Sequence, residues 1–164
     1  LLDRDKFRVR LYDYNMDYLN IEKKSKRDNL TFKQKCRLTP EEYEQIRFGD
    51  IEWMENDSRP LIKDLYVQMK LYQLKPMTVV DYEREVFIYE YGNVRVTFDG
   101  CIKTSFRNND LLNPDLAMVE TTPNVVVLEV KFDEYLPDII KQLLQVIDRR
   151  KGGYSKYQYS RMFG

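Results

Sequence analysis

Several segments of the chain alternate cationic and apolar residues with the two-residue period of a β-strand. In the segment FRVRLY, residues 7–12, the even-numbered positions are polar, with Arg8, Arg10 and Tyr12, and the odd-numbered positions are apolar, with Phe7, Val9 and Leu11. We call the two sets of alternate positions the polar parity and the apolar parity. Because successive side chains of a strand point to opposite faces, the two arginines are predicted to lie side by side. The planar guanidinium of arginine and the compact charge of lysine both suit phosphate oxygens, so such a face could bind a phosphorylated anion.

Five further strand candidates repeat this separation of polar and apolar faces. Their residues of the polar parity are Glu22, Lys24 and Lys26; Lys33, Lys35 and Arg37; Tyr82 and Arg84; Asn93, Arg95, Thr97 and Asp99; and Glu129 with Lys131. A solvated face explains any one strand, since antiparallel sheets commonly expose one side to water. Soluble surfaces interleave both signs of charge, however, and cations opposite one another repel. The joint pattern therefore predicts a cavity wall that binds a polyanion, with the apolar faces turned outward under helices.

The few acids of this polar face leave two interpretations open. Glu22, Asp99 and Glu129 could be ion-pair partners of the cations, or they could hold Mg²⁺ or Mn²⁺, which prefer oxygen ligands. The chain has no histidine, which excludes histidine-based triads and His-rich zinc sites. It also lacks the GxxxxGK and GxGxxG motifs, so neither a P-loop nor a Rossmann site accounts for phosphate binding.

The elements that would position these residues are strands interrupted by a few helices. Strands are predicted over residues 6–12, 19–26, 31–38, 77–90, 93–100, 115–120 and 124–132. Helices are predicted over residues 39–49, with Thr39 as N-cap and Gly49 as terminator, over 58–72, with Ser58 as cap, and over 137–147. No linker or repeat divides the chain, so residues 1–164 are interpreted as a single domain. The fold class is predicted as α+β, an antiparallel sheet or barrel with helices packed outside.

Charge and composition narrow the class of protein further. The net charge is zero, but Lys and Arg outnumber Asp and Glu by 11 to 6 over residues 1–37, and the remainder is correspondingly acidic. Cys36 and Cys101 form no disulfide framework, which indicates a reducing compartment and two inert thiols. No apolar run reaches the roughly 20 residues that span a bilayer, so a soluble, cytoplasmic chain is expected. A tether to a membrane outside this sequence stays open.

The order of these motifs resembles the vacuolar transporter chaperone (VTC) domain. FRVRLY, IEKKSK, KQKCRL, DYEREVF, NVRVTFD, VLEVKF and the terminal YSKY follow one another as in that family, over nearly the whole chain. The family comprises polyphosphate polymerases of the triphosphate tunnel metalloenzyme (CYTH-like) superfamily. The resemblance implies an antiparallel β-barrel tunnel lined by basic residues and acids. Family members begin with an earlier strand carrying an acid-rich motif and a lysine, so we expect the first strand to be missing here and the barrel to have an open edge.

The resemblance also implies roles for individual residues. The catalytic, phosphate-binding cations carried over from the family are Arg8, Arg10, Lys24, Arg84 and Arg95, and Lys35, Tyr82, Lys131 and Lys156 are further phosphate contacts. Glu129 corresponds to the family's metal-binding glutamate and is the expected ligand of Mn²⁺ or Mg²⁺, with a catalytic role. The implied reaction is metal-assisted transfer of the γ-phosphate of ATP to a growing polyphosphate chain. ATP and polyphosphate are therefore the expected partners.

Two other functions stay open from the sequence. The same tunnel could hydrolyse a triphosphate or tripolyphosphate, or the chain could be a non-catalytic module that binds polyphosphate or nucleic acid. Most aromatic residues fall on the parity opposite the cations, which disfavours nucleic acid as a partner. Charge reversal of Glu129 should separate catalysis from binding, since a pure binder would keep its affinity for anions.

Overall fold

The computed structural model describes residues 4–28, 30–145 and 152–162, and the chain forms two compact units. The first unit comprises Leu1–Met77 with Asn109–Leu116, and the second comprises Thr78–Asn108 with Ala117–Gly164. Over the described residues the fold is mixed α+β, with two antiparallel sheets and four α-helices. The α+β prediction is confirmed at this level, whereas barrel closure and the single-domain organisation stay predictions. No helix in the described ranges is both long enough and apolar enough to cross a membrane.

An antiparallel sheet of three strands forms the first part of the first unit. Its strands lie in the order β1 (Arg4–Arg10), β2 (Asn20–Arg27) and β3 (Leu30–Arg37), and the short 3-10 helix η1 (Met16–Tyr18) connects β1 to β2. The register places Val9 opposite Ile21 and Ile21 opposite Cys36. Apolar residues of the three strands therefore share one face of the sheet.

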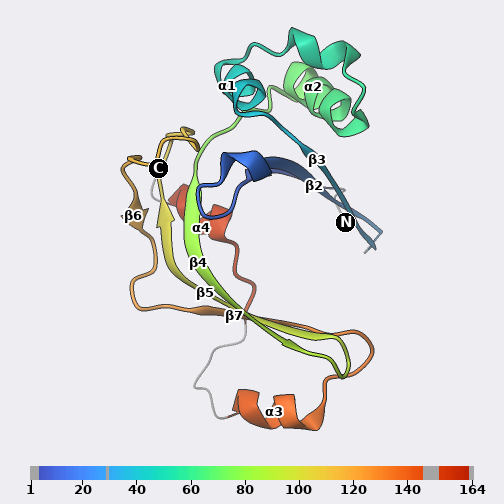
Figure 1. The fold of residues 1–164 in the computed structure, drawn as a ribbon, viewed down its shortest axis with the longest axis vertical. Helices are drawn as coiled ribbons and strands as arrows, with labels where there is room; N and C mark the ends of the chain where they lie inside the picture. Colours follow the sequence, from blue (N-terminus) through green and yellow to red (C-terminus); the bar gives the residue numbers. More distant parts are fainter. Residues whose placement is uncertain (1–3, 29, 146–151, 163–164) are drawn as a thin grey trace. The chain divides into compact units, whose positions relative to one another are not determined.

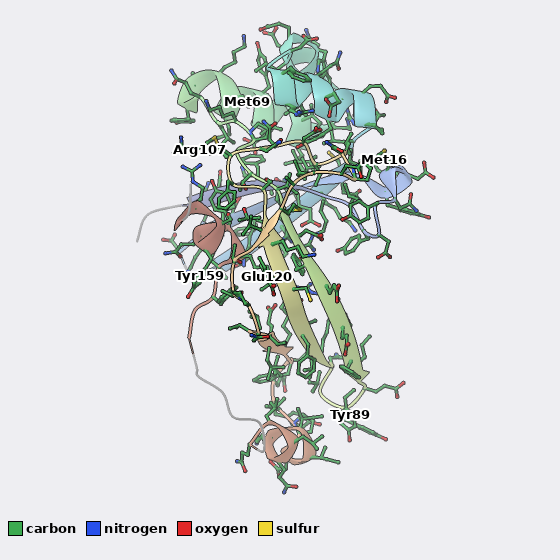
Figure 2. All side chains as sticks on the ribbon, turned by 90° about the vertical axis from the view of Figure 1, so that its left-hand side faces the viewer. Met16, Met69, Tyr89, Arg107, Glu120 and Tyr159 are labelled. Carbon is green, nitrogen blue, oxygen red and sulfur yellow. The ribbon has the colours of Figure 1, made fainter. Side chains whose placement is uncertain are left out.

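Helices cover this apolar face. They are α1 (Pro40–Phe48), the 3-10 helix η2 (Glu52–Asn56) and α2 (Pro60–Tyr72), and α1 and α2 stand together in Figure 1. The buried core joins them to the sheet through Leu19, Ile21, Leu38, Tyr43, Ile46, Ile51, Met54, Leu61, Ile62 and Leu65. Phe7, Val9 and Leu11 pack against this core, as does Met69 of α2 (Figure 2). The predicted orientation of the apolar parity of FRVRLY, toward the helices, is thus confirmed.

Local sequence sets the ends of α1 and α2. Thr39 Oγ1 accepts a hydrogen bond from the Glu42 amide at 3.1 Å, while the Glu42 carboxylate accepts one from the Thr39 amide at 2.9 Å. Gly49 ends α1 in the left-handed conformation, with a φ of 82°, as predicted. The predicted cap of α2 is wrong, because Arg59 and not Ser58 is its N-cap. Pro60 fixes the first helical position, where its missing N–H costs no hydrogen bond.

The second unit is built around β5, which pairs with every other strand of its sheet. The elements are β4 (Val80–Tyr89), β5 (Val94–Thr104), β6 (Val119–Glu120), β7 (Val127–Lys131), α3 (Asp138–Gln145) and α4 (Lys156–Met162). Figure 2 labels Tyr89 at the hairpin end of β4 and Tyr159 on α4. A bulge interrupts the β4–β5 ladder, where Cys101 adopts a φ of 50°.

Two predicted strands differ clearly from those observed. β1 ends at Arg10, and not at residue 12, because the chain turns at Asp13 and Tyr14, both of which have positive φ. The strand predicted over 115–120 is reduced to β6, because the chain turns where the Leu116 amide donates to the Asn113 carbonyl. The other strands agree with the predicted ranges except at their ends, and β5 continues to Thr104 through the bulge.

The helices of the second unit also differ from expectation. α3 confirms the described part of the helix predicted over 137–147, of which residues 146 and 147 lie outside the described residues. The sequence pattern predicts no helix at α4. Of the helices that the structure describes, none covers Phe87 of β4, which is 56% exposed although its ring packs edge-on against Phe98. The expectation that the apolar faces lie under helices is therefore wrong at this position.

Candidate phosphate-binding site

The face of the first-unit sheet that lies opposite the core is almost entirely cationic. Strand register forms three rows across it: Arg10, Asn20 and Arg37; Arg8, Glu22 and Lys35; and Lys6, Lys24 and Lys33. We use the name cationic face for Lys6, Arg8, Arg10, Lys24, Lys26, Lys33, Lys35 and Arg37. Of the strand residues whose side chains the structure describes, Glu22 is the one acid on this face. The sheet thus concentrates charge of one sign on one side.

Several lysines of this face have no acid beside them. Arg8 Nε donates to Glu22 Oε2 at 2.5 Å, yet the Arg8 side chain stays 59% exposed. Arg10 Nη1 donates to the Tyr12 hydroxyl at 3.0 Å. Within the described part of the chain, no ion pair joins Lys24, Lys33 or Lys35 to an acid. An anion could therefore neutralise these three lysines.

Lys23 shows how strictly strand parity sorts the lysines of β2. Lys23 lies on the opposite face of the sheet from Lys24. There its Nζ lies 3.0 Å from Asp5 Oδ2 and 2.5 Å from Asp64 Oδ2 of α2. Burial alone would lower the pKa of Lys23, but the hydrogen bonds to Asp64 and Asp5 outweigh burial and the pKa is raised. Lys23 is thus an internal ion-pair partner that ties β2 to β1 and α2.

The second-unit sheet has a polar face of different composition. Arg84 lies opposite Asp99, Thr97 opposite Glu129, and Arg95 opposite Lys131, so all six side chains share one face across β4, β5 and β7. This confirms the parity predicted for these residues. Glu129 and Lys131 form an ion pair, in which Lys131 Nζ lies 3.1 Å from Glu129 Oε1, and both side chains are exposed.

A buried carboxylate anchors one end of this face. Asp99, whose side chain is 1% exposed, receives Arg84 Nε at 2.6 Å on Oδ1 and Arg84 Nη2 at 2.7 Å on Oδ2. Lys156 Nζ of α4 reaches Oδ2 as well, at 2.5 Å. Burial alone would raise the pKa of Asp99, but the hydrogen bonds from both cations outweigh it and the pKa is lowered. The carboxylate is therefore ionised at neutral pH. It contacts both Arg84 and Lys156, two residues that are predicted to bind phosphate.

The surroundings of Glu129 fit a metal that is shared with a phosphorylated substrate. The described residues hold no cluster of three or more acids, cysteines or histidines that could bind a metal alone. Thr97, opposite Glu129, is 5% exposed, and its buried Oγ1 has no hydrogen-bond partner among the residues that the structure describes. Mg²⁺ is commonly held by one or two carboxylates together with substrate phosphates and water. One carboxylate beside one unpartnered hydroxyl matches that type of site.

The structure brings the predicted residues together in two groups. Arg8, Arg10, Lys24 and Lys35 belong to the cationic face, and Tyr82, Arg84, Arg95, Glu129, Lys131 and Lys156 belong to the second unit. Their binding roles stay predictions. Sequence reasoning missed Lys6, although it has the same parity as Arg8. It left open that Asp99 is an ion-pair partner of the cations, which the structure shows, but it did not identify Lys156 as one of those cations, because no local signal links Asp99 to Lys156.

Comparison with known proteins supports one assignment. A model of the VTC domain family matches residues 1–163. No curated protein and no solved structure gives a significant match to the chain. The resemblance inferred from FRVRLY and the later motifs is confirmed, because the matched region spans practically the whole sequence. The chain belongs to the VTC domain family.

Proposed function

We propose that this chain is a polyphosphate polymerase, which transfers the γ-phosphate of ATP to the end of a polyphosphate chain. Membership of the VTC domain family, which is associated with such enzymes, supports this proposal. The observation that carries it is the cationic face, on which a row of lysines (Lys6, Lys24 and Lys33) lies directly opposite one another. Such like-charged neighbours are destabilising unless an anion lies between them. A polyanion with one charge per phosphate is the ligand that fits.

In this proposal the cationic face and the polar face of the second-unit sheet each bind phosphate groups. Each face presents cations from adjacent strands. Lys24 and Arg95 are therefore each expected to contribute to anion binding. Single substitutions of either residue should weaken tripolyphosphate binding, measured by titration calorimetry.

The reaction needs charge neutralisation and alignment more than proton transfer. A terminal oxygen of the polyphosphate chain attacks the γ-phosphorus of ATP, and the bond from that phosphorus to the β,γ-bridging oxygen breaks. ADP leaves with the bridging oxygen, and the chain grows by one phosphate. The attacking oxygen is already anionic, so no histidine is required as a base. Arginine and lysine side chains neutralise the oxygens of the transferred group and hold donor and acceptor in line.

A divalent cation, Mn²⁺ or Mg²⁺, is part of the proposal. Glu129 would hold it, with the Thr97 hydroxyl as a second oxygen donor and substrate phosphates completing its coordination. When bound, the ion supplies neutralisation of the charge that develops on the phosphates. Lys131, which contacts Glu129, would orient the carboxylate and partly balance its charge.

The test uses ATP and Mn²⁺ with the intact chain, and it follows ADP and polyphosphate length together. We expect stoichiometric ADP and lengthening polyphosphate from the wild type, and neither product from Glu129→Lys. Glu85→Lys is the matched control, because Glu85 is an exposed acid that lies opposite Phe98, on the other face of the same sheet. Orthophosphate without chain growth would identify a hydrolase instead. Tight tripolyphosphate binding without any product, retained in Glu129→Lys, would identify a non-catalytic binder.

A further inference from the structure

The cluster around Asp99 draws together groups from β4, β5 and α4. Asp99 is practically inaccessible, whereas the side chains of Arg84 and Lys156 keep 24% and 21% of their surface exposed. The Tyr82 ring lies beside both cations, with its centroid 5.2 Å from Arg84 Cζ and 4.6 Å from Lys156 Nζ. One carboxylate and one aromatic ring thus contact the same two cations.

The cluster keeps donors available for a ligand. Arg84 uses Nε and Nη2 on the carboxylate, and Lys156 uses a single N–H. Apart from Asp99, no further hydrogen bond or ion pair of Arg84 or Lys156 is found among the residues that the structure describes. Arginine carries five N–H donors and lysine three, so both cations, whose side chains are partly exposed, retain donors that Asp99 does not use. Two cations with one acid also leave the cluster with a net positive charge.

We propose that Asp99 is a positioning residue that fixes Arg84 and Lys156 for simultaneous contact with one phosphate group. This inference rests on the proposed function, to which it adds a residue that does not itself touch the substrate. Two neighbouring cations repel, and each long side chain has considerable rotamer freedom. The buried carboxylate cancels the repulsion and selects one arrangement before the phosphate arrives. Binding then loses less conformational entropy, which is the usual benefit of preorganisation.

Two other roles for Asp99 make different predictions. As an anchor for α4 alone, Asp99 would affect stability and leave phosphate affinity unchanged. As an internal competitor for the two cations, it would weaken phosphate binding, and its removal would raise affinity. Neutralising Asp99 adds one net positive charge to the protein, so simple electrostatics also predicts tighter binding of a polyanion. A loss of affinity would therefore oppose the electrostatic trend and point to geometry.

The experiment measures tripolyphosphate binding by titration calorimetry, together with kcat and KM for ATP, in wild type, Asp99→Asn and Glu85→Gln. Glu85→Gln makes the same charge change on the opposite face of the sheet. Immobilising two long side chains at binding costs an amount that corresponds to about 5- to 100-fold in affinity. We expect a loss in this range for Asp99→Asn, accompanied by a fall in kcat, and no loss for Glu85→Gln. Unchanged or tighter binding by a folded Asp99→Asn would overturn the proposal.

A double-mutant cycle separates positioning from a general structural effect. In an Arg84→Met/Lys156→Met background, Asp99→Asn should cause no further loss of tripolyphosphate affinity, because its effect passes through those cations. Additive losses would overturn the proposal. If Asp99→Asn does not fold, Asp99→Glu replaces it, since this variant keeps the charge and displaces the carboxylate by one methylene. A wild-type chain that binds no tripolyphosphate overturns both proposals, whereas wild-type binding that survives substitution of Asp99 overturns only its positioning role.

Discussion

Adjacent lysines on β2 give the sharpest test of the sheet in the first unit. Lys23 and Lys24 have the same chemistry and neighbouring positions, but strand register turns Lys23 toward the core side and Lys24 onto the cationic face. Lys23→Met and Lys24→Met remove the same charge and retain a side chain of similar length. We therefore expect one variant to lose stability and the other to lose anion binding.

The expected cost of Lys23→Met follows from what the substitution leaves behind. The side chains of Lys23, Asp5 and Asp64 are 11%, 15% and 31% exposed, so the variant leaves two carboxylates largely buried without their shared cation, although Arg27 Nη2 still lies 2.8 Å from Asp5 Oδ1. Breaking a fully buried ion pair costs about 3–5 kcal/mol, and the partial exposure of Asp64 together with the remaining Asp5–Arg27 pair reduces this to about 2–3 kcal/mol. Tripolyphosphate affinity should stay within about twofold of the wild type, because Lys23 lies on the opposite side of the sheet from the cationic face. A twofold change corresponds to less than about 0.5 kcal/mol of binding free energy.

Lys24→Met should have the opposite profile. Its neighbours across the strands are Lys6 and Lys33, so removal of Lys24 relieves repulsion and raises stability by as much as about 1 kcal/mol. Loss of a charge-assisted contact to phosphate at an exposed position costs about 1–2 kcal/mol of binding free energy, or roughly 5- to 30-fold in affinity.

The assays are urea unfolding for stability and calorimetric titration with tripolyphosphate for binding. Trp53 is the single tryptophan of the chain and packs against the core of the first unit, so its fluorescence reports unfolding of that unit. Equal effects of the two substitutions on stability, or weaker tripolyphosphate binding by Lys23→Met than by Lys24→Met, would refute the assignment of the two faces.

Three further outcomes are expected. Hydrogen bonds from Arg59 lower the pKa of Asp57 and, against the opposing effect of burial, that of Glu42. Their stabilising contribution is therefore present at neutral pH and lost as pH falls below about 4, so Arg59→Met should destabilise most at pH 7 and progressively less in acid, as measured by urea unfolding. Gly92→Ala should cost about 1–3 kcal/mol, because residue 92 has a φ of 77° and a Cβ there would lie 2.9 Å from the Tyr135 carbonyl oxygen; a thermal melt that matches the wild type would contradict this. Glu129→Gln should weaken Mn²⁺ binding in the presence of tripolyphosphate, followed by electron paramagnetic resonance, whereas Glu85→Gln, on the opposite face of the sheet, should leave it unchanged.

Strand parity explains why much of the site could be predicted from sequence. The rule that neighbouring side chains face opposite ways is local, so the separation of Arg8 from Phe7 and of Arg95 from Val94 follows directly from the letters. The ends of β1 could not be predicted in the same way. The alternation continues through Leu11 and Tyr12 although the chain turns just afterwards, because hydrophobic periodicity does not encode backbone dihedral angles.

Contacts between segments that are far apart in the chain could not be predicted from the sequence pattern. Asp99 and Lys156 are far apart in the chain, and α4 is too short to give a clear helical period. The cap of α2 illustrates competition between two local signals, since Ser58 is a favourable cap residue but Pro60 fixes the helix start one residue later. Where a single local rule acts alone the prediction holds, and where a second constraint competes it fails.

The cationic face also bears on how the first unit finds its register during folding. A shift of one residue in the pairing of β2 would turn every side chain of that strand to the other side. Asn20 or Glu22 would then take the buried place of Ile21 under α1 and α2, and Ile21 would be left in water. Burial of a polar or charged group without a partner costs several kcal/mol, so each misaligned state is far less stable than the native one. The polar residues of β2, which would face a polyanion in the finished protein, would therefore also reject incorrect strand pairings while the chain is still folding.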